Sequence, residues 1–152
     1  MSYIERHLLP GEVVTFRTHL HWKIFVAPAC AAVVLVAGAL WALSANRVAV
    51  AIAPAAVAVI VLLVPWLRRV NSEFAVTNKR VIIKLGVLST RSLELLLSKV
   101  EAITVTQPLT GRLFGYGEIM VTGSGGTQER FDNIQSPLDF RQAVQAATSS
   151  GE

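Results

Sequence analysis

The sequence has almost no cysteine and few charged residues. Its one cysteine is Cys30, and charged residues make up only 16% of its 152 positions. A single cysteine excludes an internal disulfide framework and any zinc or iron–sulfur site built from several cysteines. With 53% hydrophobic residues and a mean hydropathy of +0.52, the chain has more apolar side chains than a small water-soluble domain hides easily. The composition therefore indicates a membrane protein.

The formal net charge of +4 does not indicate a surface that binds nucleic acid. Residues 1–69 carry six Lys or Arg and two Asp or Glu, whereas residues 70–152 carry eight of each sign. The basic excess therefore lies wholly in the hydrophobic half of the chain. There it fits membrane topology and contact with lipid, and we expect no nucleic-acid partner.

Two uncharged runs are long enough to cross a bilayer as helices. Residues 24–43 and 48–67 each provide about 20 apolar positions, enough for the roughly 30 Å of a membrane core. Because the linker between them is short and polar, we expect a transmembrane hairpin over 24–67. Three Lys or Arg precede the first run, one lies in the linker and five follow the second run closely. This asymmetry predicts that both termini are cytoplasmic.

The two runs lack the Asp, Glu, Lys, Arg or His that a proton relay or ion pathway needs inside a membrane. A pump or coupled transporter is therefore not indicated. Small residues do recur at a four-residue spacing, which lets helix backbones approach closely. This spacing fits either packing of the hairpin against itself or self-association into a homo-oligomer. The pairs are Ala27/Ala31, Gly38/Ala42 and Ala51/Ala55.

After residue 69, apolar and polar residues alternate, a pattern typical of strands. Short connections join the strands, which predicts an antiparallel meander rather than a parallel sheet. A further strand is expected over 12–20, within an N-terminal cytoplasmic segment of residues 1–23. The strands expected after the hairpin are 73–77, 80–85, 88–97, 100–107, 118–122 and 128–134.

A helix is predicted at the C-terminal end of the chain. Ser136 has the position of an N-cap, Pro137 that of the first helical residue, and Asp139 completes the spacing of a capping box. The helix should cover the open end of the sheet with one apolar face. That face comprises Phe140, Val144 and Ala147. The predicted cytoplasmic domain covers residues 70–147, and residues 148–152 are expected to form a disordered tail.

Several short motifs are similar to those of one family. They are Val76–Arg80, Leu97–Glu101, Gly115–Gly117 and Ile134–Pro137, with Leu8–Glu12 before the hairpin. In these motifs the sequence resembles the bacterial pleckstrin-homology (PH) domain found in small membrane proteins with two spans. The resemblance implies a strongly bent antiparallel β-sheet closed by a C-terminal helix. The expected fold class is therefore an α+β membrane protein, with a two-helix transmembrane hairpin and a PH-like sheet capped by that helix.

No pattern associated with catalysis or a cofactor is complete. The glycine-rich segment 111–117 lacks the Gly-Lys-Ser/Thr ending that holds phosphate and magnesium, so turn glycines explain it better than a nucleotide site. His19 and His21 could face one side of a strand, but no third metal ligand stands at a suitable spacing. Ser89, Ser92 and Ser98 have no histidine near them in the sequence, and the histidines all precede the first apolar run. We expect no catalytic residue, no metal, no cofactor and no enzymatic activity.

Five cations that follow the second run are the one group to which we assign a role. They stand on the side of the membrane where anionic lipid accumulates, and each cation near that surface contributes about 1 kcal/mol of attraction. The alternative is that the two arginines only enforce topology and the other cations are solvated. The predicted anionic-lipid contacts are Arg68, Arg69, Lys79, Arg80 and Lys84.

Together these observations favour a non-enzymatic scaffold or adaptor that spans the bacterial inner membrane twice. Its PH-like domain would bind a protein partner, or another copy of the chain, at the cytoplasmic face, aided by anionic lipid. The alternative hypothesis is an accessory, non-catalytic subunit of a membrane enzyme or export complex. The sequence identifies neither the partner nor the number of copies.

Overall fold

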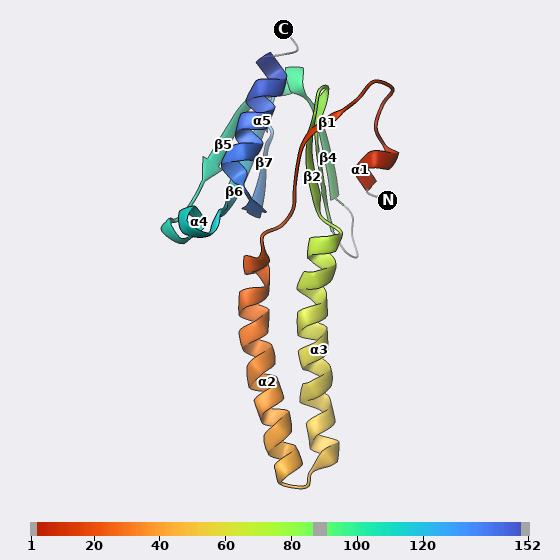
Figure 1. Cartoon of the computed structure of the whole chain (residues 1–152), viewed down its shortest axis with the longest axis vertical. Helices are drawn as coiled ribbons and strands as arrows, with labels where there is room; N and C mark the ends of the chain where they lie inside the picture. The colour runs from red at the N-terminus through yellow and green to blue at the C-terminus, as the bar shows by residue number, and fades with distance from the viewer. Residues whose placement is uncertain (1–2, 87–90, 150–152) are drawn as a thin grey trace. The chain divides into compact units, whose positions relative to one another are not determined.

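The computed structural model describes residues 3–86 and 91–149, and the chain divides into two compact units (Figure 1). One unit, Trp22–Val70, is a pair of long helices and is called the hairpin below. The other unit combines residues 1–21 with residues 71–152 and is called the sheet domain. The sheet domain is therefore assembled from segments that lie on both sides of the hairpin in the sequence.

The hairpin begins with a short 3₁₀ turn, η1 (Trp22–Phe25), and continues as α2 (Val26–Ser44) and α3 (Val48–Val70). Both helices are long and apolar enough to cross a membrane. The run predicted over 48–67 lies within α3, which continues beyond it and includes Arg68 and Arg69 in its last turn.

Small side chains form the contact between α2 and α3. Most of the buried positions are seven residues apart, as in helices that cross at a shallow angle. Ala42 and Ala51 from the predicted small-residue pairs lie in this contact, whereas their partners Gly38 and Ala55 are exposed. The predicted small-residue pairs therefore account for only part of the contact between α2 and α3. The buried residues are Ala32, Ala39 and Ala42 in α2, and Ala51, Ala58 and Pro65 in α3.

The described strands of the sheet domain form two antiparallel sheets, so the predicted antiparallel pairing holds but the meander is divided in two. The strand predicted before the hairpin is present, pairs with β2 and begins at Val14. The predicted third strand is described from Arg91 onward, because residues 88–90 lie outside the described part. The first sheet has the order β1 (Val14–Thr18), β2 (Glu73–Thr77), β3 (Arg80–Leu85), β4 (Arg91–Leu96). The second has the order β5 (Val100–Thr106), β6 (Tyr116–Gly123), β7 (Gln128–Gln135), and η2 (Leu97–Lys99) connects the sheets.

The main core contains residues from both sheets and from the C-terminal helix, α5 (Pro137–Ser149). The predicted apolar face of this helix is buried at all three positions. The ring of Phe140 meets that of Phe16 edge-on, with centroids 6.4 Å apart. Burial of such aromatic rings contributes strongly to the stability of a small domain.

Both ends of α5 differ in detail from the prediction. The helix begins at Pro137, and the amide of Phe140 donates to the carbonyl of Ser136. Ser136 has φ of 50°, whereas an N-cap residue is ordinarily extended. At the other end, Thr148 and Ser149 belong to the helix rather than to a disordered tail, and residues 150–152 lie outside the described part.

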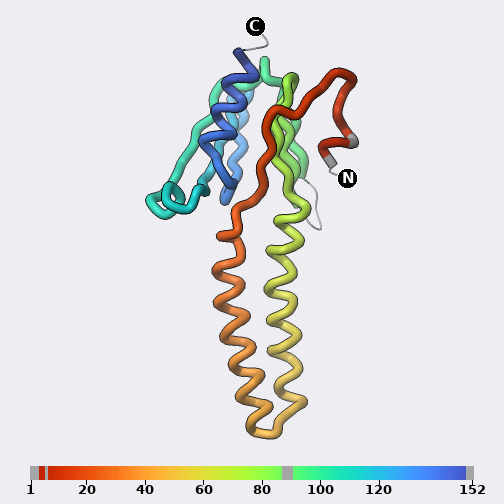
Figure 2. Tube along the Cα trace, in the orientation of Figure 1, coloured from red at the N-terminus to blue at the C-terminus, as the bar shows by residue number. Residues whose placement is uncertain are grey.

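The N-terminal segment covers the face of the first sheet that points away from the main core. It contains one turn of helix, α1 (Tyr3–Arg6), and Figure 2 traces it as it folds back beside the strands. Ile4 is fully buried against Ala75 and Ile82, whose neighbours along the strands point into the main core. The central strands β2 and β3 are therefore buried on both faces, which explains why their sequence is nearly continuously apolar.

A short helix that the sequence did not predict, α4 (Leu109–Phe114), lies between β5 and β6. It ends at Gly115, whose φ of 74° is the left-handed conformation that glycine adopts most readily. A side chain at Gly117 would lie 2.9 Å from the carbonyl oxygen of Thr106. These glycines therefore serve a turn and a close backbone approach, as predicted.

Candidate functional site

The five predicted lipid-contacting cations do not form one cluster. Arg68 and Arg69 end α3 in the hairpin, and the other three belong to the β2–β3 pair of the sheet domain. Lys79 and Arg80 lie at the turn where β2 meets β3, whereas Lys84 lies opposite Glu73 at the start of β2. At about 3.3 Å per residue, Arg80 and Lys84 are separated by about 13 Å along β3.

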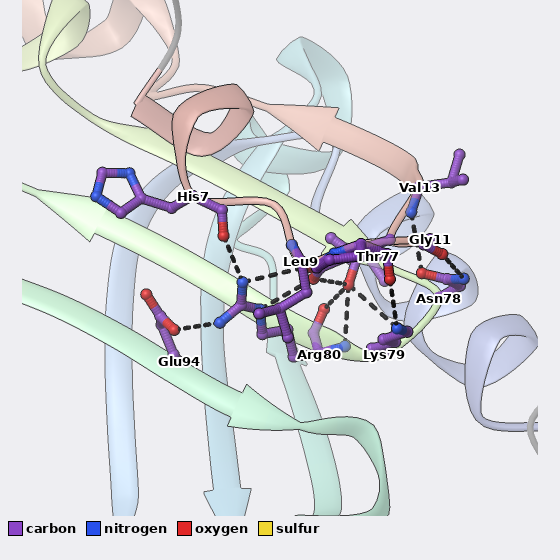
Figure 3. A network of polar contacts seen from close by, with 12 residues as sticks. His7, Leu9, Gly11, Val13, Thr77, Asn78, Lys79, Arg80 and Glu94 are labelled. Atoms are coloured by element: carbon purple, nitrogen blue, oxygen red, sulfur yellow. Dashed lines mark hydrogen bonds and ion pairs between the residues drawn. The ribbon is translucent and has the colours of Figure 1, made fainter.

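Arg80 is almost buried, with 12% of its side chain exposed, and it is paired with two carboxylates (Figure 3). Its Nε and Nη2 donate to the two oxygens of Glu12, each at 2.9 Å. Its Nη1 donates to Glu94 at 2.6 Å, and Nη2 also donates to the carbonyl of His7 at 2.7 Å. A guanidinium that is held in this way has a structural role that the sequence did not predict.

Glu12 is the buried partner in this network, with a side chain that is 0% exposed. Besides the two bonds from Arg80, its oxygens accept the amide of Leu9 at 2.7 Å and the hydroxyl of Thr77 at 2.8 Å. The oxygen of Thr77 in turn accepts the amide of Arg80 at 3.0 Å. The carboxylate therefore has four donors, as a buried charge requires.

The neighbouring residues tie the same two segments together. The amide of Asn78 donates to the carbonyl of Val13, and its Oδ1 accepts the amide of Val13. Its Nδ2 donates to the carbonyl of Gly11. Lys79 donates through Nζ to the carbonyl of Pro10 at 3.0 Å. Thus the two family-like motifs Leu8–Glu12 and Val76–Arg80, which lie on opposite sides of the hairpin in sequence, meet in one polar site.

The ionisation of the pair follows from these contacts. Burial alone would raise the pKa of Glu12, but the hydrogen bonds from Arg80, Leu9 and Thr77 outweigh it and hold this pKa below its ordinary value. The hydrogen bond to Glu12 raises the pKa of Arg80 above its ordinary value, against the effect of burial. Both groups are therefore charged at neutral pH.

The lowered pKa predicts how the attachment of the N-terminal segment depends on pH. Glu12 contributes stability that is complete above the ordinary glutamate pKa, about 4.3, and that is lost as pH falls through its lowered folded value. An NMR titration of the Leu9 amide should therefore have a lower midpoint in the full chain than in a peptide of residues 5–16. Glu12→Gln should abolish the titration, and an equal or higher midpoint in the full chain would contradict the assignment.

Two grooves are formed by described residues of the sheet domain. The larger, about 310 Å³, lies between α5 and β5, a strand with one strand neighbour in the described part of the chain. Its lining includes Glu101, Ala102, Ile103, Val144, Gln145 and Thr148. The smaller, about 280 Å³, lies between α4 and the start of α5 and includes Arg112, Leu138 and Asp139.

The two histidines considered as metal ligands are separated by their environment. His21 is buried, its amide donates to Asn133, and its ring lies 5.1 Å from that of Tyr116. His19 is exposed. Within residues 3–86 and 91–149, no group of three or more His, Cys, Asp or Glu side chains is arranged to hold a metal.

The chain matches a family model over most of its length. The family model described as the bacterial PH domain matches residues 23–148, which include all of the hairpin except Trp22 and most of the sheet domain. No curated protein matches the chain. The motif Leu8–Glu12 lies before the matched range, although the structure joins it to Val76–Arg80 within that range.

Proposed function

Because the chain belongs to the bacterial PH-domain family, we propose that it is a membrane-anchored adaptor whose sheet domain binds a protein segment. The hairpin would cross the bacterial inner membrane twice, with both termini and the sheet domain in the cytoplasm. The observation that carries this proposal is a groove beside an edge strand in a domain that is joined to two apolar helices. No catalytic role is proposed.

The exposure of the two helices supports a membrane location. In an apolar stretch of 18 residues, only 11% of the first helix and 17% of the second is buried. A core helix of a soluble protein would be mostly buried. Their exposed side chains include Val33, Leu40, Ile52 and Val59. A lipid bilayer is the solvent that accepts such a surface without cost.

The proposed topology makes a direct prediction. In a Cys30→Ala background, Ser44→Cys at the end of α2 should react with an impermeant maleimide in intact cells, because the positive-inside rule places the adjoining linker in the periplasm. Ser149→Cys should react only after lysis. The reverse pattern would overturn the orientation.

Binding through the larger groove is supported by its construction. β5 presents an unpaired backbone edge in the described part of the chain, and an extended segment can add to such an edge as a further strand. Val144 on α5 and Ile103 on β5 give the groove apolar side chains beside the polar Gln145 and Thr148. Main-chain bonds would supply affinity, and the groove would select the side chains.

The test is site-specific photo-crosslinking in cells. A benzoylphenylalanine at Ala102 or Gln145, both exposed and both in the lining, should give one discrete adduct. The same probe at exposed Arg130 on β7 is the matched control and should give none. An adduct at twice 16.4 kDa would identify a second copy as the partner, and a larger one a membrane-protein partner or the accessory-subunit alternative. Equal labelling at all three positions would overturn the proposal.

Self-association through the hairpin is a further part of the proposal. Its outer surface keeps the small residues Ala27, Ala31, Gly38 and Ala55 exposed. An apolar groove of about 470 Å³ on the hairpin, lined mainly by α2, would accept a helix of another copy. Contact through the small residues or through this apolar groove would make a homo-oligomer and leave the groove beside β5 free for another partner.

Anionic lipid should contact the chain chiefly through Arg68, Arg69 and Lys84. Arg80 is paired within the domain, and Lys79 lies at the opposite end of β2 from the connection to α3. In a Trp22→Phe, Trp41→Phe background, changing the three cations to glutamine should remove most of the preference for brominated phosphatidylglycerol over brominated phosphatidylcholine as a quencher of Trp66. Each cation should contribute about 1 kcal/mol, and added salt should act in the same direction.

Lys79→Gln is the matched control for the lipid measurement, because it removes one charge at a position remote from the connection to α3. It should leave the lipid preference nearly unchanged. Equal losses in this single variant and in the triple variant would show that net charge, rather than position, determines the preference.

A further inference from the structure

The short helix α4 presents an unusually exposed apolar surface. Leu109 is 84% exposed, Leu113 is 78% exposed and Phe114 is 52% exposed. Leu109 and Leu113 are four residues apart and therefore share one helical face. Leu138, which is also exposed, belongs to the groove that lies beside this helix. Apolar side chains that are grouped in this way on a small domain indicate an interaction surface.

The strand register places α4 at one particular end of the sheet domain. Only Gly115 separates α4 from Tyr116, which pairs with Gln135 on β7. The carbonyl of Gln135 accepts the hydroxyl of Thr18 at 2.7 Å, and Thr18 pairs with Phe74 near the start of β2. The end of the domain that carries α4 is therefore also the end at which β1 finishes and β2 begins.

Both connections to the hairpin leave the domain from this same end. His21, whose ring contacts Tyr116, is followed directly by Trp22 of the hairpin, and Val70 of α3 is three residues before Glu73. At no more than about 3.5 Å per residue, the second connection spans about 10 Å at most. A bilayer that the hairpin crosses must therefore lie close to this end of the sheet domain.

We propose that α4 inserts into the lipid surface, with Leu109, Leu113 and Phe114 entering the boundary between headgroups and acyl chains. This inference rests on the proposed membrane location of the hairpin. The groove beside the helix is lined by one charge of each sign, Arg112 of α4 and Asp139 of α5, so apolar burial rather than charge would hold α4 there. Insertion should therefore be insensitive to salt, unlike the contacts of the arginines and Lys84.

The experiment uses the full chain in phosphatidylglycerol/phosphatidylcholine nanodiscs, with one nitroxide label in a Cys30→Ala background. Leu113→Cys should be several-fold more accessible to oxygen than to a water-soluble nickel chelate. Ser124→Cys, in the exposed turn at the opposite end of β6, is the matched control and should show the reverse. Leu109→Ser should shift the label at 113 towards the aqueous reagent, and the label at 113 should not respond to added salt.

A label at Val59→Cys, on the exposed surface of α3, separates this inference from the proposed function. If position 59 is exposed to lipid and position 113 to water, the insertion of α4 is overturned and the membrane hairpin stands. If position 113 is shielded from both reagents, a protein covers α4 and the inference is again overturned. If position 59 is exposed to water, the membrane location fails, and the inference fails with it.

Discussion

Replacing Arg80 with methionine should destabilise the sheet domain by about 3–5 kcal/mol, the cost of removing one partner from a buried ion pair. The variant leaves the carboxylate of Glu12 buried without its cation, although Leu9 and Thr77 still donate to it. Methionine keeps much of the length of the arginine side chain, so the change removes charge and donors more than packing. Amide hydrogen exchange of β2 and β3, measured in detergent micelles, reports the loss directly.

The matched control is Arg91→Met, because Arg91 also pairs with a glutamate, at 2.7 Å from Glu129, but is 72% exposed. An exposed pair of this kind contributes less than about 1 kcal/mol. If both variants lose the same protection, burial does not determine the cost. The double variant Glu12→Gln with Arg80→Met should be more stable than Arg80→Met alone, since it no longer buries an unpaired charge.

The parts of the fold that the sequence predicted well are those whose signal is local. In β3, Val81 and Ile83 point to the main core and Ile82 to the opposite face. Alternation along the chain therefore predicts both the strand and the face of the sheet on which each side chain lies. The apolar face of α5 is likewise contained in about two turns of helix. Such elements can be recognised without knowing what they pack against.

The role of Arg80 could not be predicted in the same way, because its main partner is 68 residues away in the sequence. Counted along the chain, Arg80 is one of several cations after an apolar run, which predicts contact with anionic lipid or, as the alternative, a solvated side chain. A usable signal was nevertheless present. Glu12 and Arg80 are the last residues of two motifs that both resemble the same family. Buried acidic and basic residues occur mostly in pairs. The helix α4 was missed for a related reason: the glycines of residues 111–117 indicated the turn that is present, but nothing in their spacing indicated a helix with exposed leucines.

Replacing Ile4 with alanine should have the second large effect, a loss of about 2–5 kcal/mol in the free energy of unfolding. Ile4 is fully buried against Ala75 and Ile82, and its amide donates to Glu73 at 3.3 Å. Removal of the side chain leaves a cavity on the outer face of the first sheet. The measurement is again hydrogen exchange over β2 and β3, combined with the rate of proteolytic cleavage within residues 5–11.

Val13→Ala is the control, since Val13 is an exposed residue of the same segment and is bound through its backbone. It should change stability by no more than about 0.5 kcal/mol. Equal effects of Val13→Ala and Ile4→Ala would show that the N-terminal segment is held without the burial of Ile4.

The loss of stability measured for Ile4→Ala has an upper bound, whereas the loss for a substitution in the main core has none of this kind. The N-terminal segment can detach while the two sheets and α5 remain folded, and the loss then stops at the free energy of attachment. Ile4 and the Glu12–Arg80 pair hold the same segment, so once either contact is lost the other is lost with it. The double variant Ile4→Ala with Arg80→Met should therefore cost less than the sum of the single variants. Additive costs would show that the two contacts act independently and that the segment does not detach as one unit.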